Sequence, residues 1–277
     1  MQLHGKGTTS VVPMTAQEVW LWLLRFLVLA SLFATCLRMT HPLDNPIWHS
    51  LATTHAGFAQ ICDSARKFPP EVSVLAGLSE PTAENYDSLA SLLEPGKTAN
   101  LFLQAPPDPP ADWTIVSTGP LLQMLYDNSS PSGARENGPA SDGVLSSQPE
   151  FIPLTQADVP KMLALTQLTI PGPFGARTHE LGDYFGIRIE GRLAAMAGER
   201  LRLPGYTEIS AVCTHPDHLG RGYASALIEM LMEHICSRGE LPFLHVRSKN
   251  ARAIQVYERL WFKKRVCLHY AVLCHQI

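Results

Sequence analysis

Residues 207–250 constrain the fold more than any other stretch, because a strand, a glycine turn and a helix follow one another there. Residues 208–214 alternate in a way that predicts a strand. After the turn at Gly220 and Gly222, a helix carries apolar residues at helical spacing: Ala224, Leu227, Ile228, Leu231 and Ile235. Backbone N–H groups at the start of such a helix lack intrahelical partners, so they favour an anion such as a phosphate.

The glycine turn does not match the two common nucleotide-binding fingerprints. In G-x-G-x-x-G the third glycine would fall at Ser225, and no G-x-x-x-x-G-K-[ST] sequence occurs. The turn resembles instead the pyrophosphate loop of the GCN5-related N-acetyltransferases (the GNAT family), Q/R-x-x-G-x-G/A before a helix. Leu219 takes the Q/R place, Gly222 the glycine and Ala224 the final small residue. The departure at Leu219 removes one side-chain contact but leaves the backbone amides.

A second motif lies further along the chain. Residues 243–247 predict another strand, and Asn250 is expected to cap the helix that follows. The spacing Asn-x-x-Ala-x-x-x-Tyr, which ends at Tyr257 and is followed by Phe262, resembles the closing motif of the same family. Trp261 departs from that motif, because the family usually has glycine before the phenylalanine.

The order of predicted elements extends the resemblance from residue 151 to the end of the chain. A helix is expected at 158–167, followed by three antiparallel strands at 184–189, 193–200 and 208–214. The helix after the glycine turn, a strand at 243–247, the helix capped by Asn250 and a last strand at 264–273 complete the order. The resemblance implies an α/β (α+β) GNAT fold in the C-terminal half, with a mixed, mostly antiparallel sheet flanked by helices. The segment GERLRLPGYTEISAVCTHP is most similar to the FR47-like branch of the family.

The 277-residue chain is long enough for one large or two modest domains. We predict an apolar N-terminal extension (1–38), a scaffold lobe (39–128), a Ser/Gly/Pro-rich linker (129–150) and the GNAT domain (151–277). The first lobe is interpreted as a degenerate GNAT-like unit without catalytic groups. Its patterns predict helices at 46–65 and 82–93 and strands at 71–78, 99–104 and 113–125.

Residues 19–37 are apolar over nearly a membrane-spanning length, although Arg25 interrupts them. They are interpreted first as extraneous or loosely attached sequence before Met39, with a membrane anchor facing the cytoplasm as the second reading and an interfacial or buried helix as a third. A cleaved export signal fits badly, because a long polar stretch precedes the apolar run. We therefore expect a cytoplasmic protein that meets a membrane only if residues 19–37 are a genuine anchor.

Charge and cysteine content exclude other classes of function. A net charge of −3 gives no electrostatic footprint for nucleic acid, so no nucleic-acid partner is expected. The six cysteines form no C-x-x-C pair, which indicates a reducing compartment. Cys213, His215 and His218 lie near one another but lack a fourth ligand, and His179-Glu180 does not continue as H-E-x-x-H. No metal site is therefore predicted.

Transfer to an amine needs a base, because a lysine-like amine is protonated at neutral pH. Glu208 matches a strand carboxylate that some family members use as general base, and it could remove the proton directly or through a water if a partly dry pocket raises its pKa. The resemblance further implies that the backbone amide near Val212 stabilises the oxyanion and that Tyr257 protonates the departing thiolate. The simpler alternatives are an exposed strand glutamate and a core aromatic. The resemblance also suggests that Arg177, His179 and Glu180 lie on the acceptor side.

Acetyl-CoA and an amine acceptor are the substrates that the resemblance implies, with direct attack in a ternary complex. The residues expected to bind the cosubstrate are Val212, Cys213, Thr214, Gly220, Arg221, Gly222, Tyr223, Ala224 and Asn250. The rival hypothesis is a non-catalytic acyl-CoA-binding regulatory module, because Leu219 and Trp261 both differ from the residues of the family motifs. The sequence does not indicate which amine is the acceptor.

Overall fold

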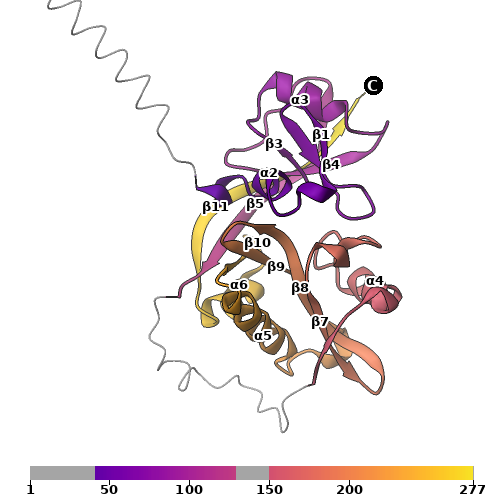
Figure 1. Cartoon of the computed structure of the whole chain (residues 1–277), viewed down its shortest axis with the longest axis vertical. Coiled ribbons are helices and arrows are strands. Elements are labelled where there is room, and N and C mark those ends of the chain that lie inside the picture. The colour runs from indigo at the N-terminus through magenta and orange to yellow at the C-terminus, as the bar shows by residue number, and fades with distance from the viewer. Residues whose placement is uncertain (1–40, 129–149, 277) are drawn as a thin grey trace, which may run out of the picture. The chain divides into compact units, whose positions relative to one another are not determined.

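One sheet runs through most of the described chain (Figure 1). The computed structural model describes residues 41–128 and 150–276, and within these ranges eight strands join in the order β4-β11-β5-β10-β9-β8-β7-β6. The strands are β4 (Thr98–Leu103), β5 (Trp113–Tyr126), β6 (Phe151–Pro153), β7 (Tyr184–Ile189), β8 (Arg192–Leu203), β9 (Tyr206–Thr214), β10 (Leu241–Arg247) and β11 (Phe262–His275). Only the β9/β10 pair among these neighbours is parallel, so the predicted mixed, mostly antiparallel sheet is confirmed.

Helices pack against both faces of this sheet. They are α2 (Pro46–Ala52), α3 (Ala83–Ala90), α4 (Val159–Thr169), α5 (Tyr223–Ser237) and α6 (Ala251–Arg259). Successive side chains of a strand point to opposite faces. Accordingly, Leu244 of β10 joins the apolar cluster that contains the buried residues of α5, whereas Phe243 joins the cluster that contains Ile47 of α2. On the α2 face, α4 also packs its Met162 with Met196 of β8.

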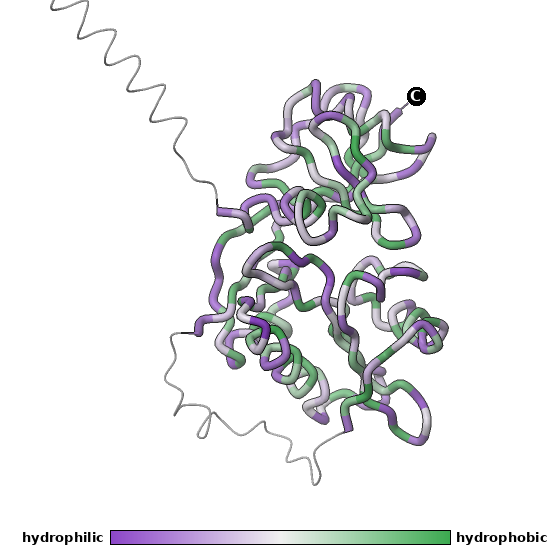
Figure 2. The backbone as a smooth tube through the Cα atoms, viewed as in Figure 1, coloured by the Kyte–Doolittle hydropathy of each residue, from purple (hydrophilic) through white to green (hydrophobic). Residues whose placement is uncertain are grey.

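Helix α5 follows the sequence prediction closely. Leu227, Ile228, Leu231 and Ile235 are all buried, and Figure 2 shows the corresponding alternation of green and purple along the helix. The helix ends where Gly239 takes a left-handed φ of 75°, which residues other than glycine rarely adopt. The N–H of Gly239 donates to the carbonyl of Cys236 at 2.9 Å, and this bond closes the last turn.

The first lobe differs from prediction in two places. The helix expected over 46–65 ends at Ala52, because Thr53 leaves the helical conformation, with φ of −130° and ψ of −101°. The strands β1 (Gln60–Cys62) and β2 (Ala65–Lys67) follow. The strand expected over 71–78 is reduced to β3 (Ala76–Leu78), since the N–H groups of Val72 and Ser73 both bond to the carbonyl of Pro69 in a turn.

The other elements of the first lobe agree with prediction. Thr82 caps α3 by accepting the N–H of Asn85, and β4 and β5 lie where strands were expected. Both strands belong to the same sheet as β6 to β11, so the sheet is continuous across the predicted boundary between lobe and domain. The division at 128 and 151 remains a prediction, and the residues after 128 depend on β5 to complete their sheet.

The predicted N-terminal extension and nearly all of the predicted linker lie outside the described residues. Within residues 41–128 and 150–276, no helix has both the length and the apolar character needed to cross a membrane. The prediction about residues 19–37 therefore stays a prediction.

Candidate functional site

Strands β9 and β10 pair at one end and separate at the other. Their parallel register runs from Tyr206 opposite Leu241 to Glu208 opposite Phe243 and ends there. Beyond that point β9 stays paired with β8 as far as Thr214. Strand β10 is paired on its other edge with β5 as far as Arg247. The edges of β9 and β10 that would face each other carry no further register pair in the described chain. The sheet therefore has a branch point at Glu208.

A β-bulge lies just beyond the branch point. Met196 pairs with Cys213 and Gly198 pairs with Ser210, so Ala211 and Val212 together oppose the single residue between them on β8. Ala211 has a left-handed φ of 53°, which is uncommon for a residue with a Cβ. Such bulges break the regular ladder and redirect backbone groups. The backbone of Val212, which the resemblance assigned to oxyanion binding, thus lies in an irregular segment beside the branch point.

The loop before α5 presents free donors. Gly220 and Gly222 both have φ of 77°, and a Cβ at either position would meet no atom within 4 Å. Glycine is therefore required there for its backbone conformation and not for close packing. Among the described residues, none accepts a hydrogen bond from the N–H groups of residues 220–225. Leu219 and Arg221 are exposed beside them. This arrangement of free amides at a helix N-terminus suits a phosphate.

Glu208 lies in a tightly paired environment. Its carboxylate is fully buried and accepts hydrogen bonds from Arg200 Nε at 2.9 Å, Arg200 Nη2 at 2.6 Å and His245 Nδ1 at 2.7 Å. Burial by itself would raise the pKa of Glu208, but the positive charge of Arg200 and the hydrogen bonds from His245 and Arg200 outweigh it and lower the pKa to about 2. The rise in pKa considered from the sequence is therefore wrong, because Arg200 pairs with the buried carboxylate.

The sequence analysis did not identify Arg200 and His245 as members of the site. Arg200 lies in β8, eight residues before Glu208, and its side chain is only 11% exposed. His245 lies in the apolar strand β10 with a side chain that is 1% exposed. The available signal was a polar residue at an inward-facing position of a buried strand, since such groups are normally paired.

Tyr257 lies in α6 and packs against the same apolar cluster as Val212. Its ring meets Phe262 edge-on, with centroids 6.2 Å apart. Burial raises the pKa of Tyr257 to about 12, so the phenol keeps its proton at neutral pH. Asn250 caps α6 as predicted, because its side-chain oxygen accepts the N–H of Ala253 at 3.2 Å.

The turn after α6 is kept although Trp261 replaces the glycine of the family motif. Its φ is 65°, in the left-handed region where glycine is normally preferred. The carbonyl of Trp261 accepts the N–H of Asp127 at 3.0 Å, which ties the turn to the end of β5. The turn after α6 is thus kept, with a tryptophan in the glycine conformation.

The remaining predicted residues surround the loop and the bulge. Cys213 is buried, and burial raises the pKa of its thiol to about 11. Thr214 ends β9, while Tyr223 and Ala224 begin α5, with Tyr223 buried. On the other face, Arg177 donates to Glu180 at 2.7 Å and to Glu71 at 3.1 Å, so its guanidinium is engaged by protein carboxylates.

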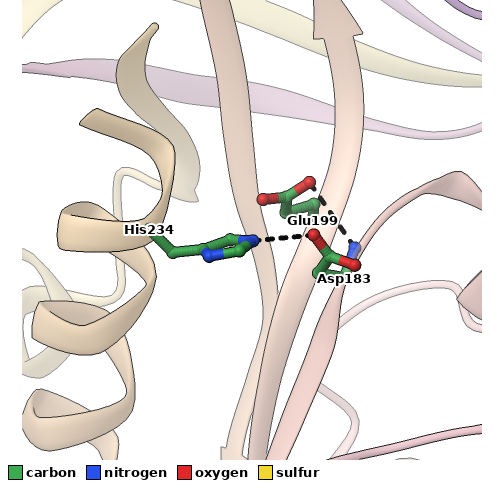
Figure 3. A group of neighbouring side chains, drawn as sticks. All are labelled: Asp183, Glu199 and His234. Atoms are coloured by element: carbon green, nitrogen blue, oxygen red, sulfur yellow. Dashed lines mark hydrogen bonds and ion pairs between the residues drawn. The ribbon is translucent and has the colours of Figure 1, made fainter. Parts of the chain in front are cut away.

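One cluster has the composition of a cation site: Asp183, Glu199 and His234 (Figure 3). His234 Nε2 lies 2.8 Å from a carboxylate oxygen of Asp183. Arg238, however, donates to Glu199 at 2.6 Å and to Asp183 at 3.4 Å. A guanidinium already supplies the positive charge that a metal would bring, so this cluster is best interpreted as an ion-pair network.

Comparisons with known proteins identify relatives. The model of the family described as FR47-like protein matches residues 184–271. A structure from Novosphingobium aromaticivorans DSM 12444 is described as an acetyltransferase assigned to the GNAT family. It shares 35% identity with this chain, covers 86% of this chain and 100% of its own, and has a TM-score of 0.75. A GCN5-related N-acetyltransferase from Kribbella flavida shares 15% identity, covers 81% of this chain and 95% of its own, and has a TM-score of 0.53, which shows the fold alone. No curated protein sequence matches this chain.

Proposed function

The chain belongs to the GNAT family of acetyltransferases, and from that premise we propose that it transfers an acetyl group from acetyl-CoA to a primary amine. The acyl group passes directly to the amine in a ternary complex, without a covalent enzyme intermediate. The observation that carries this proposal is the branch between β9 and β10 beside a loop of free amides. Acyl transfer is the general chemistry of this fold, and the choice of acetyl-CoA and of an amine is the finer proposal.

The loop before α5 suits the diphosphate of coenzyme A. Free N–H groups of residues 220–225 and the positive end of the α5 dipole favour negative charge, and the two glycines leave room for it. The pantetheine arm would then run along the unpaired edge of β9. The amide of Val212, in the bulge, would donate to the thioester oxygen as it gains negative charge.

Tyr257 would donate a proton to the departing thiolate. The phenol remains protonated at neutral pH, which is the state a general acid needs. Val212 and Tyr257 border the same apolar cluster, which supports placing the sulfur between them. The attacking nitrogen bonds to the acyl carbon, the carbon–sulfur bond breaks, and the proton from Tyr257 goes to sulfur.

Glu208 would accept a proton from the attacking nitrogen, directly or through a water. A carboxylate with a pKa near 2 is a weak base toward a free ammonium. The ammonium would first lose one proton to water, and the neutral nitrogen would attack. Once bonded to the acyl carbon, that nitrogen is far more acidic, so Glu208 would accept its second proton at that stage.

The proposal is tested by calorimetry with acetyl-CoA, followed by a thiol-release assay against a panel of amines. We expect binding together with thiol release for at least one amine class. The variant Tyr257→Phe should keep acetyl-CoA affinity and lose about a hundredfold in turnover, the usual scale for a general acid. Binding without thiol release on any amine would instead indicate a regulatory acyl-CoA-binding module. Unchanged turnover of Tyr257→Phe would remove this residue from the mechanism.

A cytoplasmic location is proposed because the acyl-CoA pool that the reaction consumes lies there. N-terminal mass spectrometry of the mature protein would show whether residues 1–38 are present. If they are, fractionation with membranes would support the anchor reading of residues 19–37.

A further inference from the structure

A chain of hydrogen-bonded side chains continues from Glu208 across the sheet, beyond the pair with Arg200. His245 Nε2 lies 3.0 Å from Gln123 Nε2, and Gln123 Oε1 accepts from Arg265 Nη1 at 2.8 Å. Arg265 in turn bonds to Asp44, and its position is thereby fixed. Each step joins a different neighbour in the fold, because these residues lie on β9, β10, β5, β11 and the short turn Pro42–Asp44.

The orientation of the Gln123 amide follows from its three neighbours. Its nitrogen donates to the carbonyl of Leu43 at 2.8 Å, and its oxygen accepts from Arg265. Rotating the amide by half a turn would bring two oxygens together at Leu43 and two donors together at Arg265. Gln123 is fully buried, so water does not relieve either conflict. The nitrogen of the amide therefore faces His245.

This orientation determines the tautomer of His245. Because Gln123 presents a donor, Nε2 of His245 must accept, and the single ring proton lies on Nδ1. That proton is donated to the carboxylate of Glu208 at 2.7 Å. A second ring proton, on Nε2, would point at the amide donor of Gln123. The network thus holds the imidazole neutral, with Nδ1–H directed at Glu208.

The surroundings of His245 reinforce this state. The rings of Phe102 and Phe243 lie with centroids 4.7 and 5.6 Å from its own, so two sides of the imidazole are apolar. Within the described residues, Arg200 bonds directly to Glu208 and the buried phenol of Tyr184 interacts electrostatically with both. Arg265 and Asp44 lie beyond Gln123.

The oxygen atoms of Glu208 are used unequally. Oε1 accepts from Arg200 Nη2 and from His245, whereas Oε2 accepts only from Arg200 Nε. A carboxylate has about four acceptor positions, two on each oxygen. Oε2 therefore keeps one position for a further donor.

We propose that Gln123 and His245 are positioning residues that fix the orientation of the Glu208 carboxylate, with the proton of His245 on Nδ1. This inference rests on the proposed function, because that function gives Glu208 its role in transfer. It also makes β5 part of the site, so residues 151–277 alone do not contain the complete positioning set.

The tautomer is tested without any assay of activity. In the full-length protein labelled with ¹⁵N-histidine, the resonances of His245, assigned by their loss in His245→Gln, should show a protonated Nδ1 and an unprotonated Nε2 at neutral pH. In Gln123→Glu, a carboxylate replaces the amide donor, and both ring nitrogens should become protonated. A wild-type protein with the proton on Nε2, or an unchanged pattern in Gln123→Glu, would overturn the inference.

The role in transfer is tested with Gln123→Met, which removes the amide at similar volume. We expect kcat to fall about tenfold with the KM for acetyl-CoA unchanged, because a hydrogen bond to the Glu208 pair is lost. Gln276→Met is the matched control, since the side chain of this exposed glutamine bonds only to Thr114, at 2.6 Å, among the described residues. Equal kcat in both variants would overturn the positioning role. If Gln123→Met does not fold, the inference is judged by the tautomer of His245 in the wild-type protein.

The two proposals fail in different ways. Wild-type protein with the expected His245 tautomer but no thiol release on any amine would refute the proposed function and support the network assignment. Thiol release together with the opposite tautomer would keep the function and refute the network assignment.

Discussion

Replacing Arg200 by methionine should strongly destabilise the fold, because it leaves the buried carboxylate of Glu208 with His245 as its main partner. Arg200 donates two hydrogen bonds, at 2.9 and 2.6 Å, to a side chain that is 0% exposed. Removing one partner of a buried ion pair typically lowers the free energy of unfolding by about 3–5 kcal/mol. The double variant Arg200→Met/Glu208→Gln should recover most of this loss, because neither charge remains buried.

The same pair predicts how stability depends on pH. Burial opposes ionisation of Glu208, but Arg200 and His245 outweigh it and hold the folded-state pKa at about 2, below the ordinary value of 4.5. Since the folded-state pKa is the lower one, this stabilisation is present above pH 4.5 and is lost as the pH falls toward 2. The difference corresponds to about 3 kcal/mol. The variant Glu208→Gln should lack this part of the acid dependence.

Urea unfolding followed by tryptophan fluorescence measures both effects, at neutral pH and at several lower values. Arg177→Met is the control, because Arg177 pairs with Glu180 at 2.7 Å with side chains that are 43% and 31% exposed, and its removal should change stability little. The reasoning is refuted if Arg200→Met costs less than about 1 kcal/mol, the scale of an exposed pair. It is also refuted if the double variant is no more stable than Arg200→Met.

Three further predictions follow from the geometry. Gly222→Ala should weaken acetyl-CoA binding in calorimetry, because φ of 77° costs a residue with a Cβ about 1–2 kcal/mol; Gly57→Ala, with open space and ordinary φ, is the control, and equal affinities would contradict the loop assignment. Gly198→Ala should lower the Tm by the equivalent of about 1–3 kcal/mol, because its Cβ would overlap the ring of Tyr184, and an unchanged Tm would contradict this packing. Glu208→Gln should lose activity by the same factor between about pH 5 and 9, since the wild-type carboxylate is ionised throughout that range, and a defect confined to low pH would show a higher pKa.

Local patterns in the sequence predicted the central elements well. Strand β9, the glycine turn, helix α5 and the Asn250 cap all appear close to their expected positions. Each depends on contacts within a few residues, such as alternation, left-handed glycines or a side chain that accepts a nearby N–H. The first lobe was predicted less well, because the turns at 53–58 and 69–73 interrupt patterns that look continuous in sequence.

The electrostatic character of the site depends on distant partners. His245 lies 37 residues from Glu208, and Gln123 lies 122 residues from His245. The sequence showed a glutamate on a strand but not whether burial or an arginine would dominate its pKa. The expected rise was therefore wrong, and the pair with Arg200 could be recognised only once β8 and β9 were side by side.

The sequence by itself determined the family, the strand–loop–helix that presents free amides and the positions of Glu208 and Tyr257 along the chain, because all of these follow from local spacing. Only the tertiary structure decided the charge state of Glu208, the tautomer of His245 and the contribution of β5. The physical reason is that a buried charge or proton is governed by the groups that surround it in space, and the folded sheet brings those groups from both halves of the chain.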